Sequence, residues 1–223
     1  MVKSTLPQRN RIGDWTYTQI RDAILDGEME PGTRLSVPDL ARQLNVSRSP
    51  ARESILRLLA EGLAVETPHR GASVADITTN DLRDLYSVRG VLEGLAARLV
   101  VMSRTASEDD LESAVLRQRR AVETKDFGAI AEADMFFHTT LYSLSGNRRL
   151  EDSLLRMQNL VRLGMRTTMR IPGASERALE EHQQILEAIQ SGDADAAESC
   201  ARSHIDRLMA ALPEPSPIPP RTS

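Results

Sequence analysis

The amino-acid sequence predicts a mostly α-helical protein built as two domains. Hydrophobic residues make up 40% of the 223-residue chain but aromatic residues only 3%, so the core must consist mainly of Leu, Ala, Ile, Val and Met. Apolar residues recur at helical spacing over most of the length, and alternating runs typical of strands are rare. We therefore expect an N-terminal winged helix-turn-helix and a C-terminal all-α antiparallel helical bundle.

Changes in sequence pattern divide the chain into four segments. A polar, flexible arm is expected over residues 1–12, and a winged helix-turn-helix over residues 13–76. That domain should hold three helices, capped by Asp14, Ser36 and Ser47, and two extended runs over residues 64–67 and 72–75. Residues 77–212 show long helical periods that indicate about six helices. Residues 213–223 are rich in Pro, which cannot continue a helix, so this tail is expected to be disordered.

The composition excludes several classes of protein. The single cysteine, Cys200, rules out an internal disulfide and suits a reducing compartment. No apolar run approaches the ~20 residues of a membrane-spanning helix, and residues 1–11 lack the apolar stretch of a signal peptide. We therefore expect a cytoplasmic protein with no membrane partner. The net charge of −4 argues against coating nucleic acid along the whole chain, but residues 42–57 hold four arginines and one acid. Positive charge focused in this way suits contact with DNA phosphates.

The stretch from Ser47 to Glu53 has the pattern of a DNA-reading helix. The Ser47 hydroxyl is expected to accept from the free amides of the first helical turn. Arg48 and Arg52 are four residues apart and therefore share one helical face. Guanidinium groups in that position suit a DNA major groove, where they pair with guanine. Taken alone, the stretch is explained equally well as a solvated amphipathic helix, but its place between two helices and a basic hairpin favours a DNA reader.

Three of the four histidines, His138, His182 and His204, fall on three different predicted helices. Asp134 lies four residues before His138, so both side chains project from one helical face. Helical bundles hold metal ions with such ligands on facing helices. Each histidine taken singly is better explained as a structural or surface residue, but the set of three favours a metal site.

Several spaced motifs in residues 14–75 resemble the DNA-binding domain of the GntR superfamily of bacterial regulators. The resemblance implies that Arg48 and Arg52 contact guanine and that Ser47 and Ser49 contact phosphates or bases. It further implies that the hairpin tip enters the minor groove. The tip consists of His69, Arg70 and Gly71, and the motifs are Pro31-Gly32-Thr33-Arg34-Leu35-Ser36, Leu40-Ala41, the stretch from Val46 to Glu53, Glu61-Gly62-Leu63 and Pro68-His69-Arg70-Gly71-Ala72.

The second domain resembles the FCD ligand-binding domain of the FadR-like branch of that superfamily, in its six-helix, VanR-type subgroup. The resemblance implies a divalent metal, Zn, Ni or Mn, and a small organic acid as effector rather than an acyl-CoA. It also implies that Arg89 clamps the acid, although a surface ion pair with Asp84 or Glu93 explains this residue equally well. The motifs include Leu85-Tyr86-Ser87-Val88-Arg89 and Asp134-Met135-Phe136-Phe137-His138, and the implied metal ligands are Asp134, His138, His182 and His204.

The sequence therefore predicts a DNA-binding transcription regulator, expected to be a repressor. It should bind a pseudo-palindromic operator as a homodimer, under the control of a small carboxylic acid at or near the metal. One alternative is a regulator with a purely structural metal and a different effector site. A metal-dependent hydrolase is more remote, because no separate general base lies beside the ligands, so we do not expect an enzyme.

Overall fold

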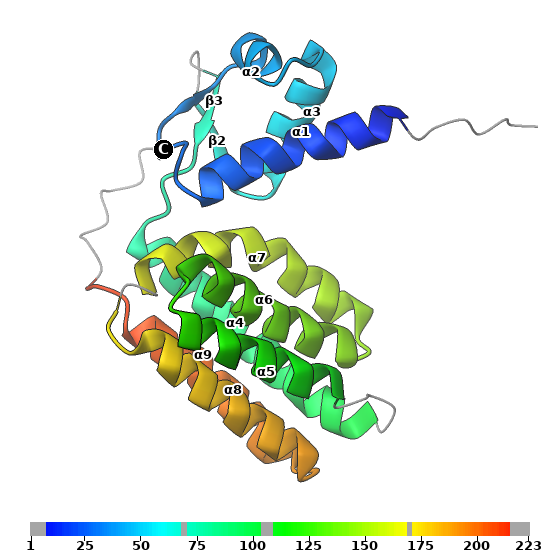
Figure 1. Cartoon of the computed structure of the whole chain (residues 1–223), viewed down its shortest axis with the longest axis vertical. Helices are drawn as coiled ribbons and strands as arrows, with labels where there is room; N and C mark the ends of the chain where they lie inside the picture. The colour runs from blue at the N-terminus through cyan, green and yellow to red at the C-terminus, as the bar shows by residue number, and fades with distance from the viewer. Residues whose placement is uncertain (1–7, 68–70, 104–108, 169–170, 215–223) are drawn as a thin grey trace, which may run out of the picture. The chain divides into compact units, whose positions relative to one another are not determined.

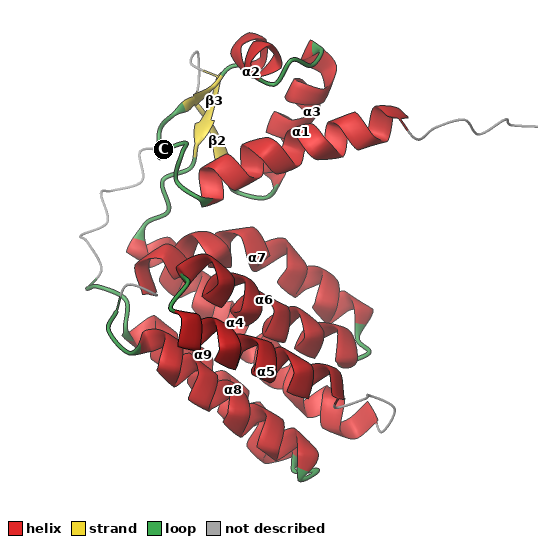
Figure 2. Ribbon diagram, in the orientation of Figure 1, coloured by secondary structure: helices red, strands yellow, loops and turns green. Residues whose placement is uncertain are grey.

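The computed structural model describes residues 8–67, 71–103, 109–168 and 171–214. The chain divides into two compact units, residues 1–77 and residues 78–223. Figure 2 shows that every strand in the described part belongs to the first unit, whereas the second is made of helices and loops. Within the described residues, no helix combines the length and the apolar character that a membrane span needs.

The first unit is a three-helix domain with a small antiparallel sheet. The strands lie in the order β1-β3-β2, with Leu35 opposite Ala72 and Val65 opposite Ser73. Apolar side chains of the three helices form the core, among them the buried Ile20, Ile24 and Leu58. The elements are α1 (Gln8–Leu25), β1 (Arg34–Leu35), α2 (Val37–Gln43), α3 (Arg48–Ala60), β2 (Ala64–Thr67) and β3 (Gly71–Val74).

Several features of this unit differ from expectation. Ser36 occupies the N-cap position of α2, but its hydroxyl accepts no backbone amide, so this predicted cap is wrong. Helix α1 begins at Gln8, so residues 8–12 are helical rather than part of a flexible arm, and Asp14 lies inside the helix instead of capping it. Gly13 does not break the helix because one interior glycine costs only about 1 kcal/mol. Strand β1 was not expected, since its two residues are extended only through pairing with β3, which is distant in sequence. Residues 1–7 lie outside the described part.

The second unit is a helical bundle, and its described part holds six helices as expected. Local signals fix several starts: the Asp126 carboxylate accepts from the amides of Gly128 and Ala129, and that of Asp193 from the amide of Ala196. Most of the tail, residues 215–223, lies outside the described part. The helices are α4 (Thr79–Ser103), α5 (Asp109–Thr124), α6 (Phe127–Leu144), α7 (Arg148–Thr168), α8 (Ala174–Gln190) and α9 (Ala194–Ala210).

Close helix packing brings four of these helices around one point. Helices α4 and α9 approach so closely at Gly94 that an added Cβ would lie 2.5 Å from Cγ of Arg202. In Figure 1, α5 lies beside α6 and α8 beside α9. Fully buried side chains such as Phe137, Leu141 and Ile185 fill the space between the helices. The same packing directs polar side chains of α4, α6, α8 and α9 into the interior.

Candidate metal centre and DNA-reading helix

The three histidines predicted as metal ligands come together inside the bundle. His138 lies on α6, His182 on α8 and His204 on α9, and none is more than 2% exposed. One ring nitrogen of each lies within 4.8 Å of those of the other two. The Nε2 atoms of His182 and His204 are 3.3 Å apart. We call these three residues the histidine cluster.

Asp134 adds an oxygen donor to the same point. It lies one turn before His138 on α6, with Oδ2 3.6 Å from Nε2 of His138 and Oδ1 3.9 Å from Nε2 of His182. Ligands held 2.0–2.1 Å from a tetrahedral Zn²⁺ ion lie roughly 3.3 Å from one another. Three of the donor separations, 3.3, 3.6 and 3.9 Å, approach the value that one small ion requires.

Each histidine of the cluster has a side-chain oxygen close to its Nδ1 atom, and for His182 and His204 the contact is a hydrogen bond. Nδ1 of His182 is 2.6 Å from Oε1 of Gln118, and Nδ1 of His204 is 2.7 Å from Oε2 of Glu181. Nδ1 of His138 is 2.8 Å from Oε2 of Glu93. These acceptors favour the tautomer with a proton on Nδ1, which leaves the lone pair of Nε2 directed at the centre of the cluster.

These acceptors were missed as functional residues at the level of the sequence. Glu181 directly precedes His182 and Glu93 follows Arg89 by one helical turn, so both offered a local signal. Gln118 offered none, because it lies on α5, 64 residues from His182. Gln118 also donates through Nε2 to Oδ1 of Asp134 over 3.3 Å, so it forms hydrogen bonds with two of the four predicted ligands, His182 and Asp134.

One buried atom of the cluster is consistent with a metal ligand. Nε2 of His138 is buried and has no hydrogen-bond partner within the described part of the chain. Its Nδ1 lies 2.8 Å from Oε2 of Glu93, but the two atoms do not form a hydrogen bond. An unpaired buried nitrogen costs free energy that coordination would remove. Three imidazoles with one carboxylate suit Zn²⁺, Ni²⁺ or Mn²⁺.

Burial sets the charge of the cluster. Burial and the neighbouring rings of His204 and His138 hold the pKa of His182 well below its ordinary value. Burial also lowers the pKa of His204, although its hydrogen bond to Glu181 acts in the opposite direction. Both rings are therefore neutral at neutral pH, which is the form that binds a metal. Burial would raise the pKa of Glu93, but Arg89 and His138 hold it below its ordinary value, so this carboxylate is ionised.

Arg89, the predicted effector clamp, forms a buried ion pair. Its Nε donates to Oε1 of Glu93 over 2.5 Å, and the hydroxyl of Tyr142 donates to the same oxygen. The partner is one of the two that the sequence offered, but the pair lies in the interior and not on the surface. Arg89 also lines a cavity of about 30 Å³ together with Asp134 and His204. This inner cavity has room for one or two water molecules.

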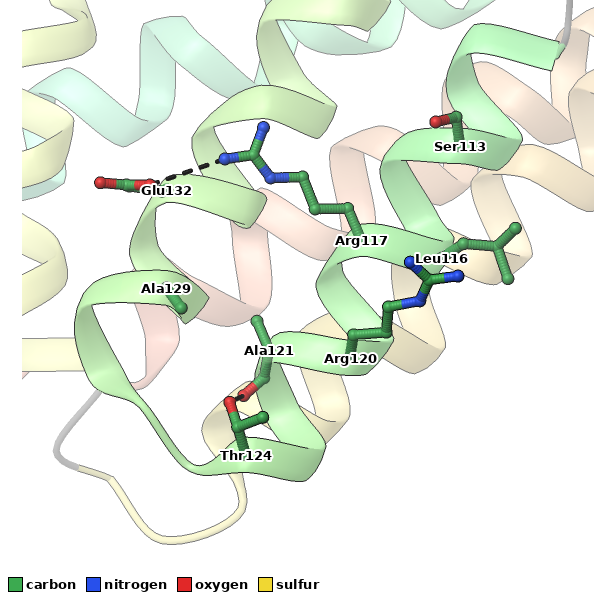
Figure 3. Close-up of a pocket in the computed structure, with 8 residues that line it drawn as sticks. All are labelled: Ser113, Leu116, Arg117, Arg120, Ala121, Thr124, Ala129 and Glu132. Atoms are coloured by element: carbon green, nitrogen blue, oxygen red, sulfur yellow. Dashed lines mark hydrogen bonds and ion pairs between the residues drawn. The ribbon is translucent and has the colours of Figure 1, made fainter.

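A larger hollow of about 510 Å³ lies at the surface between α5 and α6. Figure 3 shows the Arg117 side chain reaching across it towards Glu132, with 3.5 Å between Nη2 and Oε2. Arg120 also lines this groove. No predicted metal ligand lines it, so it is separate from the histidine cluster.

The predicted DNA-reading residues lie at the start of α3. Arg48 and Arg52 are exposed on its first two turns, and Ser49 donates to Glu53 over 3.1 Å. Ser47 occupies the N-cap position, but its hydroxyl accepts no backbone amide, so the predicted hydroxyl cap is wrong. The exposed end of the helix leaves its first amides open to solvent.

Two further features concern the predicted DNA-reading residues: the packing of α3 on α1 and the conformation of the β2–β3 hairpin. Helix α1 packs against the C-terminal part of α3. Tyr17 donates a hydrogen bond to Glu61, and the guanidinium of Arg57 lies 3.7 Å from the centre of the Tyr17 ring. At the hairpin, Gly71 has a φ of +78°, which favours glycine. The other predicted tip residues, His69 and Arg70, lie outside the described residues.

Comparisons with known proteins agree with this geometry. Residues 14–74 match the family described as bacterial regulatory proteins, gntR family, and residues 84–207 match the FCD domain. The uncharacterized HTH-type transcriptional regulator YdhC of Bacillus subtilis (strain 168) is 28% identical over 197 residues, which cover 85% of this chain and 86% of YdhC. The HTH-type transcriptional repressor RspR of Escherichia coli (strain K12) is 27% identical, with 93% and 91% covered.

The fold is also found among solved structures. The crystal structure of a putative transcriptional regulator GntR from Rhodococcus sp. RHA1 superposes with a TM-score of 0.74 at 26% sequence identity, covering 89% of this chain and 95% of that one. A structure of E. coli McbR/YncC gives a TM-score of 0.75 at 21% identity, covering 94% and 97%. The two-unit architecture is therefore shared along nearly the whole chain.

Proposed function

The chain belongs to the GntR family of bacterial regulatory proteins, with an FCD domain as its second unit, and is a DNA-binding transcriptional regulator of that type, and we propose that a small carboxylic acid bound at a divalent metal controls its DNA binding. The observation that carries the proposal is the convergence of three histidine ring nitrogens and the Asp134 carboxylate around one point. His138, His182 and His204 would complete the ligand set.

The residues around the cluster suit recognition of an anion. When bound, a divalent ion supplies an electrophilic position for a carboxylate oxygen. Asp134, His204 and Arg89 line the inner cavity together, so an acid at the metal lies beside the guanidinium. Guanidinium holds a carboxylate through two parallel hydrogen bonds. In this proposal Arg89 is shared between Glu93 and the effector.

On the DNA side, Arg48 and Arg52 would read bases, with Ser47 and Ser49 on phosphates or bases. The hairpin tip, His69, Arg70 and Gly71, would enter the minor groove. One winged unit reads one half-site, so the operator would be a pseudo-palindrome and the regulator a homodimer. The effector must bind one arrangement of the reading units better than the other. We propose that the protein is a repressor, as the relative RspR is named.

One observation favours a second candidate, in which the metal is purely structural. The inner cavity of about 30 Å³ is too small for an organic acid. In that case the ion would tie α6, α8 and α9 together, and an effector would bind elsewhere.

Replacing His182 with Ala separates the two candidates. Zinc content, thermal stability with added small carboxylates, and operator binding are measured for His182→Ala and for a matched control, Gln184→Ala, which is exposed on the same helix. We expect the control to keep zinc and to melt at a higher temperature with at least one acid, because a ligand of the folded state stabilises it. His182→Ala should lose both properties. Zinc binding without any response of melting or operator binding to the acids would support the structural metal.

A further inference from the structure

A second hollow lies against the inner cavity. This outer hollow, of about 270 Å³, opens at the surface between the α5–α6 turn and the first turn of α8. Ile130, Ala174 and Ser175 line both the outer hollow and the inner cavity, so they form a wall shared by the two spaces. On the far side of that wall lie Asp134 and His204 of the proposed metal centre.

The outer hollow is mainly apolar. Its walls include Val122, Phe127, Ile171 and Pro172. Phe127 is 66% exposed, which is the largest exposed fraction among the large apolar side chains of the described residues. Covering this ring and its neighbours with an apolar group would be favourable, because apolar surface is removed from water.

The charged residues of the outer hollow do not select a second anion. Lys125 contributes one positive charge and Glu176 one negative charge, and both are exposed. Glu176 also lies in the first turn of α8, where its carboxylate offsets the partial positive charge of the helix N-terminus. A second carboxylate would therefore find little net attraction here.

We propose that the outer hollow receives the apolar body of the effector while its single carboxylate reaches the metal centre. The ligand class is a monocarboxylic acid with an apolar chain or ring, in preference to a dicarboxylic or hydroxylated acid. This inference rests on the proposed function and explains how an inner cavity of about 30 Å³ can serve a larger acid. The shared wall must yield, and two of its three residues, Ala174 and Ser175, are small and half-buried.

A chain-length series tests the proposal. Acetate, butanoate and hexanoate are titrated calorimetrically into the zinc-loaded full chain, and hexanedioate serves as a probe of equal length with a second charge. Each methylene that becomes buried should tighten binding by about three- to fourfold. Hexanedioate should bind more weakly than hexanoate, because its second carboxylate would lose hydration without a partner.

Two phenylalanines of α6 provide a matched pair of variants. Phe127 lines the outer hollow, whereas Phe136 is 40% exposed elsewhere on the helix, with the guanidinium of Arg117 5.1 Å from its ring centre. Phe127→Ala should weaken hexanoate binding several-fold and leave acetate binding unchanged. Phe136→Ala should alter neither, and both variants should keep their zinc.

The outcomes separate this inference from the proposed function. If no acid of the series binds the zinc-loaded chain, this inference is overturned, whereas the proposed function is overturned only if no other small carboxylate raises the melting temperature of the zinc-loaded chain either. If acids bind and His182→Ala abolishes binding, but affinity does not depend on chain length or on Phe127, only the outer hollow is overturned. Equal hexanoate binding by His182→Ala would place the carboxylate away from the metal and would also overturn the inference.

Discussion

The buried ion pair between Arg89 and Glu93 offers a quantitative test of the structure. Arg89 is 2% exposed and Glu93 is fully buried, with 2.5 Å between Nε and Oε1. Glu93→Leu removes the carboxylate and leaves the guanidinium in the interior without a counter-ion. Breaking a buried pair by removing one partner costs about 3–5 kcal/mol.

The contacts of Glu93 place the cost in that range. Besides Arg89, the hydroxyl of Tyr142 loses its acceptor and Nδ1 of His138 loses its nearest oxygen. We expect the free energy of unfolding to fall by about 4 kcal/mol, a large part of the roughly 5–15 kcal/mol typical of a domain. The double variant Arg89→Leu with Glu93→Leu leaves no unpaired charge and should recover more than half of that loss, about 2 kcal/mol or more.

Urea unfolding of the metal-free protein, monitored by far-ultraviolet circular dichroism, measures the free energy of unfolding of the single and the double variant. Trp15 belongs to the first unit, so its fluorescence reports on that unit and provides an internal reference. Arg98 is a matched control, because its ion pairs with Asp195 and Glu198 lie at the surface. Arg98→Leu should change stability little. A loss of unfolding free energy in Glu93→Leu that is no larger than in the double variant would refute the unpaired Arg89 charge as the cause.

The other predictions concern DNA, metal and pH. Arg52→Ala should abolish operator binding in a gel shift without changing the melting curve. The control Arg119→Ala, at an exposed arginine of α5, should bind the operator normally. Unchanged operator affinity of Arg52→Ala would show that Arg52 does not contact DNA. Gln118→Leu removes the oxygen that accepts the hydrogen bond from His182, so it should weaken zinc binding by about 10- to 100-fold in a chelator competition. Zinc affinity equal to that of the wild type would exclude a positioning role for Gln118. The folded-state pKa values of His182 and His204 lie below the ordinary 6.5, so below that pH the unfolded chain takes up protons that the folded chain does not. The stability of the metal-free protein should therefore be retained above about pH 6.5 and fall on acidification, by up to about 1.4 kcal/mol per pH unit for each of the two residues; equal urea midpoints at about pH 7.5 and 5.5 would contradict this.

Helix ends were predictable from the sequence because the signals for them are local. The carboxylates of Asp126 and Asp193 cap α6 and α9, and aspartate is a residue type that commonly caps helices. Gly62 and Gly146 follow α3 and α6 with positive φ, a conformation that glycine adopts readily. The start of α1 was misplaced because Asp14 has the residue type of a cap but no break in the helix before it. Strand β1 was missed because its extended form depends on pairing with β3.

The predicted ligands converge in the structure because the spacing of Asp134 and His138 fixes a shared helical face, and because few buried positions accept histidine without a partner. The residues that orient the rings could not be found in the same way. The contact of Gln118 with His182 arises only when α5 packs against α8, and its amide resembles that of any polar surface residue until then. Arg89 illustrates the same limit: the pairing with Glu93 follows from a four-residue spacing, but the burial that makes it costly to break depends on the packing of the whole bundle. Sequence spacing therefore placed two of the predicted ligands, Asp134 and His138, on one helical face, whereas tertiary packing determines how firmly all four are held around the proposed metal centre.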